Sequence, residues 1–114
     1  MTLTEFNDKY YFHDSVIDKL EYQSGTLTIY CQFCDFMQAD YKDTDYSNSD
    51  IIITFHNAKY TLTSYFQIVD AEIINQIVIG NKMKLFLENY SNQCGELEIT
   101  AEYIEVKKLR SYNL

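Results

Sequence analysis

The chain has 114 residues, 46% of them apolar and 16% aromatic, which excludes a disordered chain and is enough to bury one core. Eleven Tyr and seven Phe, with three Gly and no Pro, favour strands over helices. The net charge is −8, and residues 1–50 hold ten acidic side chains against three lysines, so the chain is unsuited to direct nucleic-acid binding.

The segment Met1–Phe6 lacks the basic and apolar regions of a secretory signal, and no apolar run approaches the roughly 18 residues of a membrane span. Three cysteines, an odd number, suit a reducing compartment better than a disulfide framework. We therefore expect a cytoplasmic protein that does not associate with membranes.

The chain begins with a polar segment, residues 1–9, that is either frayed or a single helical turn. The first strand is expected over Ser15–Tyr22, and Gly25 supplies the positive φ of a tight turn into a second strand, Thr26–Phe36. Apolar and polar residues alternate along that strand, which is the period of a half-buried strand. The residues expected to face inward are Leu27, Ile29, Cys31 and Phe33.

Residues 37–50 have no period and many turn-forming residues, so we expect a long loop there. Residues 66–79 are ambiguous, because apolar residues at helical spacing lie among β-branched clusters. We expect a short helix or turn near residues 69–75, inside the segment 66–76, followed by a strand. Three other segments are expected to be strands: 51–55, and the alternating segments 59–65 and 82–90.

A last, long strand is expected to contain Leu97–Val106, with Tyr103 among its inward residues. Its alternation slips by one residue after Tyr103, which indicates either a β-bulge or a bend where the strand passes between sheets. Together these patterns predict a mainly β protein in which residues 1–114 form a single-domain antiparallel sandwich or barrel of about six to eight strands.

The tetrapeptide Phe12-His13-Asp14-Ser15 is the densest group of chemically capable side chains. Neighbours in an extended strand point to opposite faces, so His13 and Asp14 share a site only if the chain turns. In the interpretation that we favour, Asp14 or Ser15 bonds a backbone N–H just downstream and His13 packs at the end of the sheet. In the alternative interpretation, His13 is the general base of a small enzyme or ligand-binding barrel, with Asp14 or His56.

A zinc site is not expected. Cys31-Gln32-Phe33-Cys34 has the spacing of a CxxC pair, but strand alternation puts Cys31 inside and Cys34 outside, and Cys94 stands alone.

A calcium site is not expected either, although Asp43, Asp45 and Ser47 have the spacing of the first three EF-hand ligands. Asn48 and Thr54 occupy the positions at which that loop requires Gly and Glu. We therefore expect no metal and no other cofactor.

The same acidic loop is the preferred binding surface for a partner. Tyr41 and Tyr46 have the amphipathic rings typical of interface anchors, and Asp43 and Asp45 supply negative charge that attracts a basic protein. Solubility alone also explains an acidic surface.

The chain resembles a group of small bacterial β-rich domains in three places. These are Phe12-His13-Asp14-Ser15-Val16-Ile17 with the following Leu20-Glu21-Tyr22 and Gly25-Thr26-Leu27-Thr28-Ile29, then Ile53-Thr54-Phe55-His56-Asn57-Ala58, and finally Leu97–Val106. Some members of this group look like immunity proteins that neutralise toxins of bacterial competition systems. The resemblance implies an antiparallel β fold and carries over no catalytic residue.

Three functions remain as hypotheses. The first is a non-catalytic binding protein, of the immunity type, that neutralises a basic protein partner such as a toxin. The second is a small enzyme or ligand-binding barrel that uses His13 and Asp14. The third is a structural component of a larger assembly that exposes edge strands for pairing. The sequence leaves the partner, the oligomeric state and the strand order open.

Overall fold

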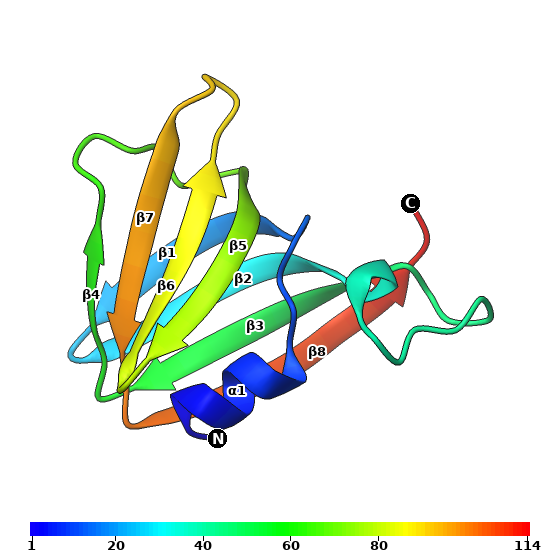
Figure 1. The fold of residues 1–114 in the computed structure, drawn as a ribbon, viewed down its shortest axis with the longest axis horizontal. Coiled ribbons are helices and arrows are strands. Elements are labelled where there is room, and N and C mark those ends of the chain that lie inside the picture. The colour runs from blue at the N-terminus through cyan, green and yellow to red at the C-terminus, as the bar shows by residue number, and fades with distance from the viewer.

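One short helix precedes eight strands, and a single turn of 3-10 helix follows the second strand (Figure 1). The structure is a computed structural model that describes residues 1–114. In chain order the elements are α1 (Leu3–Lys9), β1 (Val16–Gln23), β2 (Thr26–Cys34), η1 (Asp35–Met37), β3 (Asn48–His56), β4 (Lys59–Leu62), β5 (Ala71–Ile79), β6 (Lys82–Glu88), β7 (Cys94–Thr100) and β8 (Tyr103–Tyr112).

The eight strands form one antiparallel sheet in the order β4-β7-β6-β5-β1-β2-β3-β8. Only two residue pairs join its halves, since β1 contacts β5 through Val16 opposite Glu72 and Ile17 opposite Ala71. In Figure 1 the half from β4 to β5 folds over the half from β1 to β8. The predicted mainly antiparallel β fold of six to eight strands is therefore confirmed, in the form of a bent open sheet with free edges at β4 and β8.

The core lies between the two halves of the sheet. Ile29 and Phe55 from one half and Ile73 and Met83 from the other line one enclosed apolar space, and all four side chains are buried. The predicted alternation of β2 is confirmed, because every second residue from Leu27 to Phe33 is buried.

Helix α1 closes the core at one end. Thr2 and Glu5 form a capping box, in which each side chain accepts a hydrogen bond from the backbone N–H of the other. The ring of Phe6 then packs between Phe12, with ring centres 5.3 Å apart, and Phe55, at 5.7 Å. The segment predicted as frayed or as a single turn is thus a helix of seven residues.

Two glutamine side chains hold the segment that follows α1. The amide of Gln76 accepts the N–H of Phe12 at 2.6 Å and donates to the carbonyl of Tyr10 at 2.7 Å. The amide of Gln38 accepts the N–H of Tyr11 at 3.0 Å and donates to its carbonyl at 2.6 Å. The segment pairs with no strand, so these two side-chain amides supply the hydrogen bonds that a neighbouring strand would otherwise give to its backbone.

The predicted short helix near 66–76 is wrong, because Ala71–Ile79 is strand β5 and the residues before it are turns. Ala71 and Ile73 are buried on one side of the strand, as the two-residue period requires. The register then shifts between Ile73 and Asn75, so that a bulge changes the phase of the alternation. Phe66 and Val69 precede the strand and Ile77 lies beyond the bulge, so the apolar residues at helical spacing belong to no single face.

The single long strand predicted to end the chain is two strands, β7 and β8. The chain bends at Ala101 and Glu102, and β8 then pairs with β3 at the far edge of the other half of the sheet. Of the two alternatives for the slipped alternation, the structure has the bend. Tyr103 lies beyond this bend and is half exposed, so its predicted inward orientation is wrong. The one helix of the structure, α1, has neither the length nor the apolar character of a membrane span.

Candidate functional site

The loop between η1 and β3 is held in place by its own hydrogen bonds. Phe36 donates its N–H to the carbonyl of Ser47 at 3.0 Å, which closes the base of the loop. At its tip the carboxylate of Asp45 accepts the N–H of Lys42 at 2.9 Å, and the N–H of Asp45 returns to the carbonyl of Lys42 at 2.8 Å. Ser47 also donates its N–H to the side chain of Asn113.

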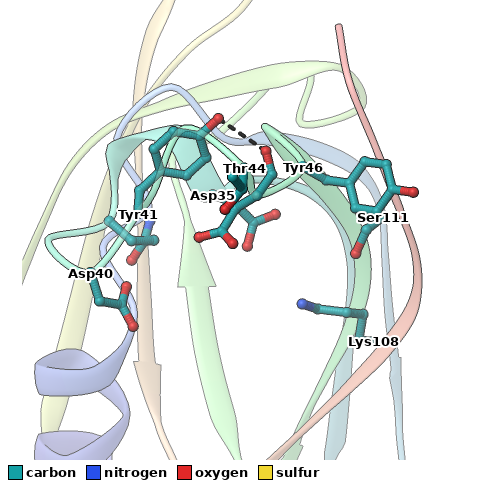
Figure 2. A pocket seen from close by; sticks show the side chains of 9 residues that line it. Asp35, Asp40, Tyr41, Thr44, Tyr46, Lys108 and Ser111 are labelled. Carbon is teal, nitrogen blue, oxygen red and sulfur yellow. Dashed lines mark hydrogen bonds between the residues drawn. The ribbon is translucent and has the colours of Figure 1, made fainter.

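This loop and the end of β8 enclose a hollow of about 470 Å³, seen from close by in Figure 2. Of the four residues predicted to bind a partner, Tyr41, Asp45 and Tyr46 line it, and the hydroxyl of Tyr41 donates to the carbonyl of Asp45 at 3.2 Å. Asp43 is exposed in the same loop but lies outside the lining. The full lining is Asp35, Gln38, Asp40, Tyr41, Thr44, Asp45, Tyr46, Lys108 and Ser111.

The lining carries a net negative charge, and its charged side chains form no ion pairs. It holds three carboxylates, from Asp35, Asp40 and Asp45, and a single ammonium group, from Lys108, and none of the four takes part in an ion pair of the structure. In Figure 2 the ammonium group of Lys108 points into the hollow. An incoming cation would therefore meet carboxylates that no cation of the chain already neutralises.

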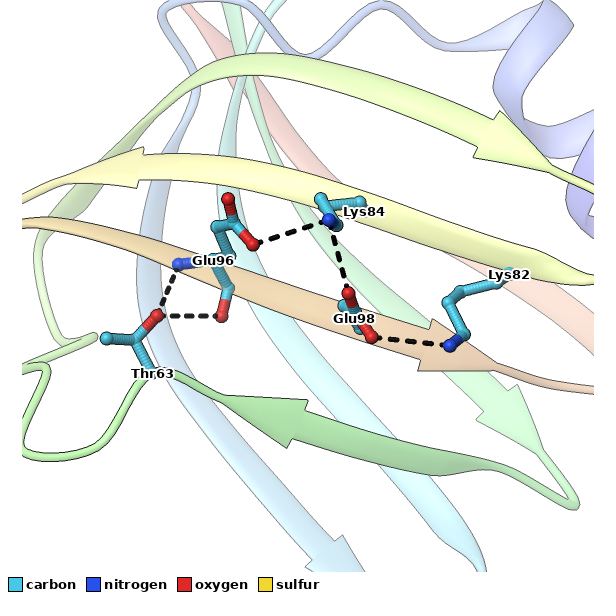
Figure 3. A network of polar contacts seen from close by, with 5 residues as sticks. All are labelled: Thr63, Lys82, Lys84, Glu96 and Glu98. Atoms are coloured by element: carbon cyan, nitrogen blue, oxygen red, sulfur yellow. Dashed lines mark hydrogen bonds and ion pairs between the residues drawn. The ribbon is translucent and has the colours of Figure 1, made fainter.

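Two glutamates of the sheet show the contrast. On the outer face of β6 and β7, Lys84 lies 3.4 Å from Glu96 and 3.2 Å from Glu98, and Lys82 lies 3.4 Å from Glu98 (Figure 3). Hydrogen bonding to Lys84 lowers the pKa of Glu98. Thr63, just after β4, hydrogen-bonds the backbone N–H and carbonyl of Glu96, and so continues the pairing of β4 with β7. Glu96 and Glu98 are thus paired with lysines, whereas the three aspartates that line the hollow are not.

Sequence reasoning did not single out six of the lining residues: Asp35, Gln38, Asp40, Thr44, Lys108 and Ser111. Asp35 accepts a hydrogen bond from the buried Ser49 at 2.5 Å, and the hydroxyl of Ser49 lies 3.2 Å from that of Ser111. Lys108 and Ser111 reach the hollow because β8 pairs with β3. No local signal in the sequence indicates that pairing, since the two strands are far apart in the chain.

The His13–Asp14 motif forms a turn, as we expected. Ser15 donates its N–H to the carbonyl of Phe12 at 2.9 Å, and Asp14 has a φ of 67°. We predicted that Asp14 or Ser15 bonds a backbone N–H just downstream, and this partner is wrong. The buried hydroxyl of Ser15 instead accepts a hydrogen bond from the N–H of Cys34, on β2, at 2.9 Å. The turn thereby joins the start of β1 to the end of β2.

The histidines do not converge on a cavity. A ring nitrogen of His13 bonds the carbonyl of Ile74 at 2.6 Å, and the ring stacks on Tyr11. His56 ends β3, with its Nε2 3.4 Å from the carboxylate of Glu105. No contact joins the two histidines, and the hollow is lined by other residues.

The cysteines are all free and differ in burial, with Cys31 buried, Cys34 partly exposed and Cys94 exposed. Burial raises the pKa of the Cys31 thiol. No group of three histidine, cysteine or carboxylate side chains is placed to hold a metal ion, at the cysteines or in the loop with Asp43 and Asp45.

No protein-family model, curated protein or solved structure matches the chain.

Proposed function

We propose that the chain is a non-catalytic binding protein whose hollow receives a basic segment of a partner protein. The observation that carries this proposal is the set of three unpaired carboxylates around one ammonium group, in a concave site whose loop is fixed by hydrogen bonds. A preformed site loses little conformational entropy on binding, and unpaired charges speed the encounter with an oppositely charged partner.

We further propose that the protein is bacterial and of the immunity type, and that its partner is a basic toxin. The resemblance of the Phe12–Ile17 segment to such domains supports this. The three free cysteines favour the reducing environment of the cytoplasm, where a self-protecting protein meets its toxin. The turn brings His13 and Asp14 together, with Nε2 of His13 3.4 Å from the carboxylate of Asp14. We do not propose an enzyme that uses them, because the other ring nitrogen of His13 bonds a backbone carbonyl and neither residue lines the hollow.

The test is affinity capture at low salt from the native cell, followed by measurement of Kd for the captured basic protein as salt increases. Asp40→Asn should weaken binding by about two- to tenfold and flatten the salt dependence, because one exposed charge contributes on the order of 1 kcal/mol. Asp40 is exposed and makes no hydrogen bond or ion pair, so the substitution leaves the fold intact.

Asp70→Asn, in the exposed turn before β5, is the matched control, since it removes the same charge at a residue that makes no side-chain hydrogen bond or ion pair and lies outside the lining of the hollow. Equal effects of the two substitutions would contradict the hollow as the site. Affinity that does not change with salt would contradict the electrostatic basis of the proposal.

A further inference from the structure

Two exposed aromatic side chains, Phe36 and Tyr11, lie beside the hollow together with the half-buried Tyr41. Phe36 is 61% exposed and Tyr11 is 42% exposed. The ring of Phe36 packs on that of Tyr41, with centres 5.2 Å apart, and Tyr41 is itself part of the lining. We call Tyr11, Phe36 and Tyr41 the aromatic shelf.

Gln38, which lines the hollow, fixes the backbone of Tyr11, and the ring of Tyr11 stacks on His13. The Gln38 amide binds both backbone groups of Tyr11 and donates to the carbonyl of Cys34 at 3.0 Å. Rigid aromatic rings that are already ordered before binding lose little entropy when they are covered, which is why they dominate many interfaces.

We propose that the aromatic shelf is the apolar half of the binding surface, and that the partner segment which fits it carries apolar side chains interspersed with basic ones. This inference rests on the proposed function and names the chemistry of the partner at the same site. The unpaired carboxylates favour the basic side chains, and the adjoining exposed rings favour apolar side chains that leave water at the same time.

Exposed aromatic residues elsewhere serve as the comparison. Tyr90 is 87% exposed in the loop between β6 and β7 and does not line the hollow. If any exposed ring increased binding, replacing Tyr90 would weaken it as much as replacing Phe36, whereas the proposed surface includes Phe36 and not Tyr90.

The experiment uses two synthetic peptides of equal length and charge, one alternating Arg with Leu and the other alternating Arg with Ser. Their binding to the whole protein is measured by calorimetry at low salt. We expect the Arg-Leu peptide to bind about tenfold more tightly, the effect of one well-packed aromatic anchor. Phe36→Ser should abolish this preference without changing the affinity for the Arg-Ser peptide, and Tyr90→Ser should preserve it.

Equal binding of both peptides to the unmodified protein would overturn the inference and leave the proposed function standing. Failure of both peptides to bind would count against the proposed function itself. Tyr11→Ser provides a second variant if Phe36→Ser fails to fold. A dimer, seen by light scattering, that Phe36→Ser dissociates would also overturn the inference, because a second copy would then cover the shelf.

Discussion

Ser15→Ala tests whether the Phe12–Ser15 motif is structural, as its hydrogen bonds indicate. Ser15 is fully buried, and its hydroxyl accepts the N–H of Cys34 at 2.9 Å. Alanine removes that oxygen, and a buried N–H without an acceptor costs about 1–3 kcal/mol. Because Cys34 is partly exposed and water reaches some of its surface, we expect a loss of about 2 kcal/mol.

That loss should be visible in both equilibrium and local measurements. With an unfolding entropy of about 2.1 cal/mol/K per residue, a loss of about 2 kcal/mol lowers the Tm of a chain of this length by about 8 °C. Urea unfolding should give a lower midpoint at an unchanged slope. The amide of Cys34 should also exchange its hydrogen faster.

The control is Ser64→Ala, at an exposed turn position whose hydroxyl makes no hydrogen bond, which should change stability by less than about 0.5 kcal/mol. A change of the same small size for Ser15→Ala, with unaltered exchange at Cys34, would refute the structural role assigned to the motif.

Two further changes test the packing and the electrostatics of the sheet. Gly95→Ala places a methyl carbon 2.5 Å from the ring of Phe66, so we expect a loss of about 1–3 kcal/mol in thermal unfolding, relieved when Phe66 is also replaced by Ala; equal costs in both backgrounds would contradict the clash. The hydrogen bond with Asp14 and burial raise the pKa of Glu72. A carboxyl with a raised pKa in the folded state destabilises the fold when ionised, so stability should rise as the pH falls from neutral through that raised pKa. Glu72→Gln should flatten this rise in urea titrations at successive pH values, and a parallel pH profile would exclude Glu72 as its origin.

Alternation along the chain was sufficient to predict most of the strands. It succeeded where one face is buried without interruption, as in Thr26–Cys34. It failed at Ile74, where a bulge changes the phase of β5, and at Ala101–Glu102, where the chain bends into β8. Both failures have one physical cause, because a period of two residues is informative only while the ladder stays in register.

The candidate site could be predicted only in the part that is local in sequence. The loop residues Tyr41, Asp45 and Tyr46 were identifiable from composition, since tyrosine and aspartate cluster there without a period. Lys108 and Ser111 were not, because they reach the hollow only through the pairing of two distant strands. The bonds of Gln38 to Tyr11 could not be predicted either, since nothing in the sequence distinguishes Gln38 from a glutamine that makes no such bonds.

Two distant parts of the chain build the hollow, so binding of a ligand there is linked to the folding of β8. The carboxylates come from residues 35–45, whereas Lys108 and Ser111 belong to β8, an edge strand whose only ladder is with β3. A ligand that binds only the assembled hollow must stabilise the attachment of β8 by mass action. Occupancy could therefore be read from slower hydrogen exchange along β8, even at amides that the ligand does not touch.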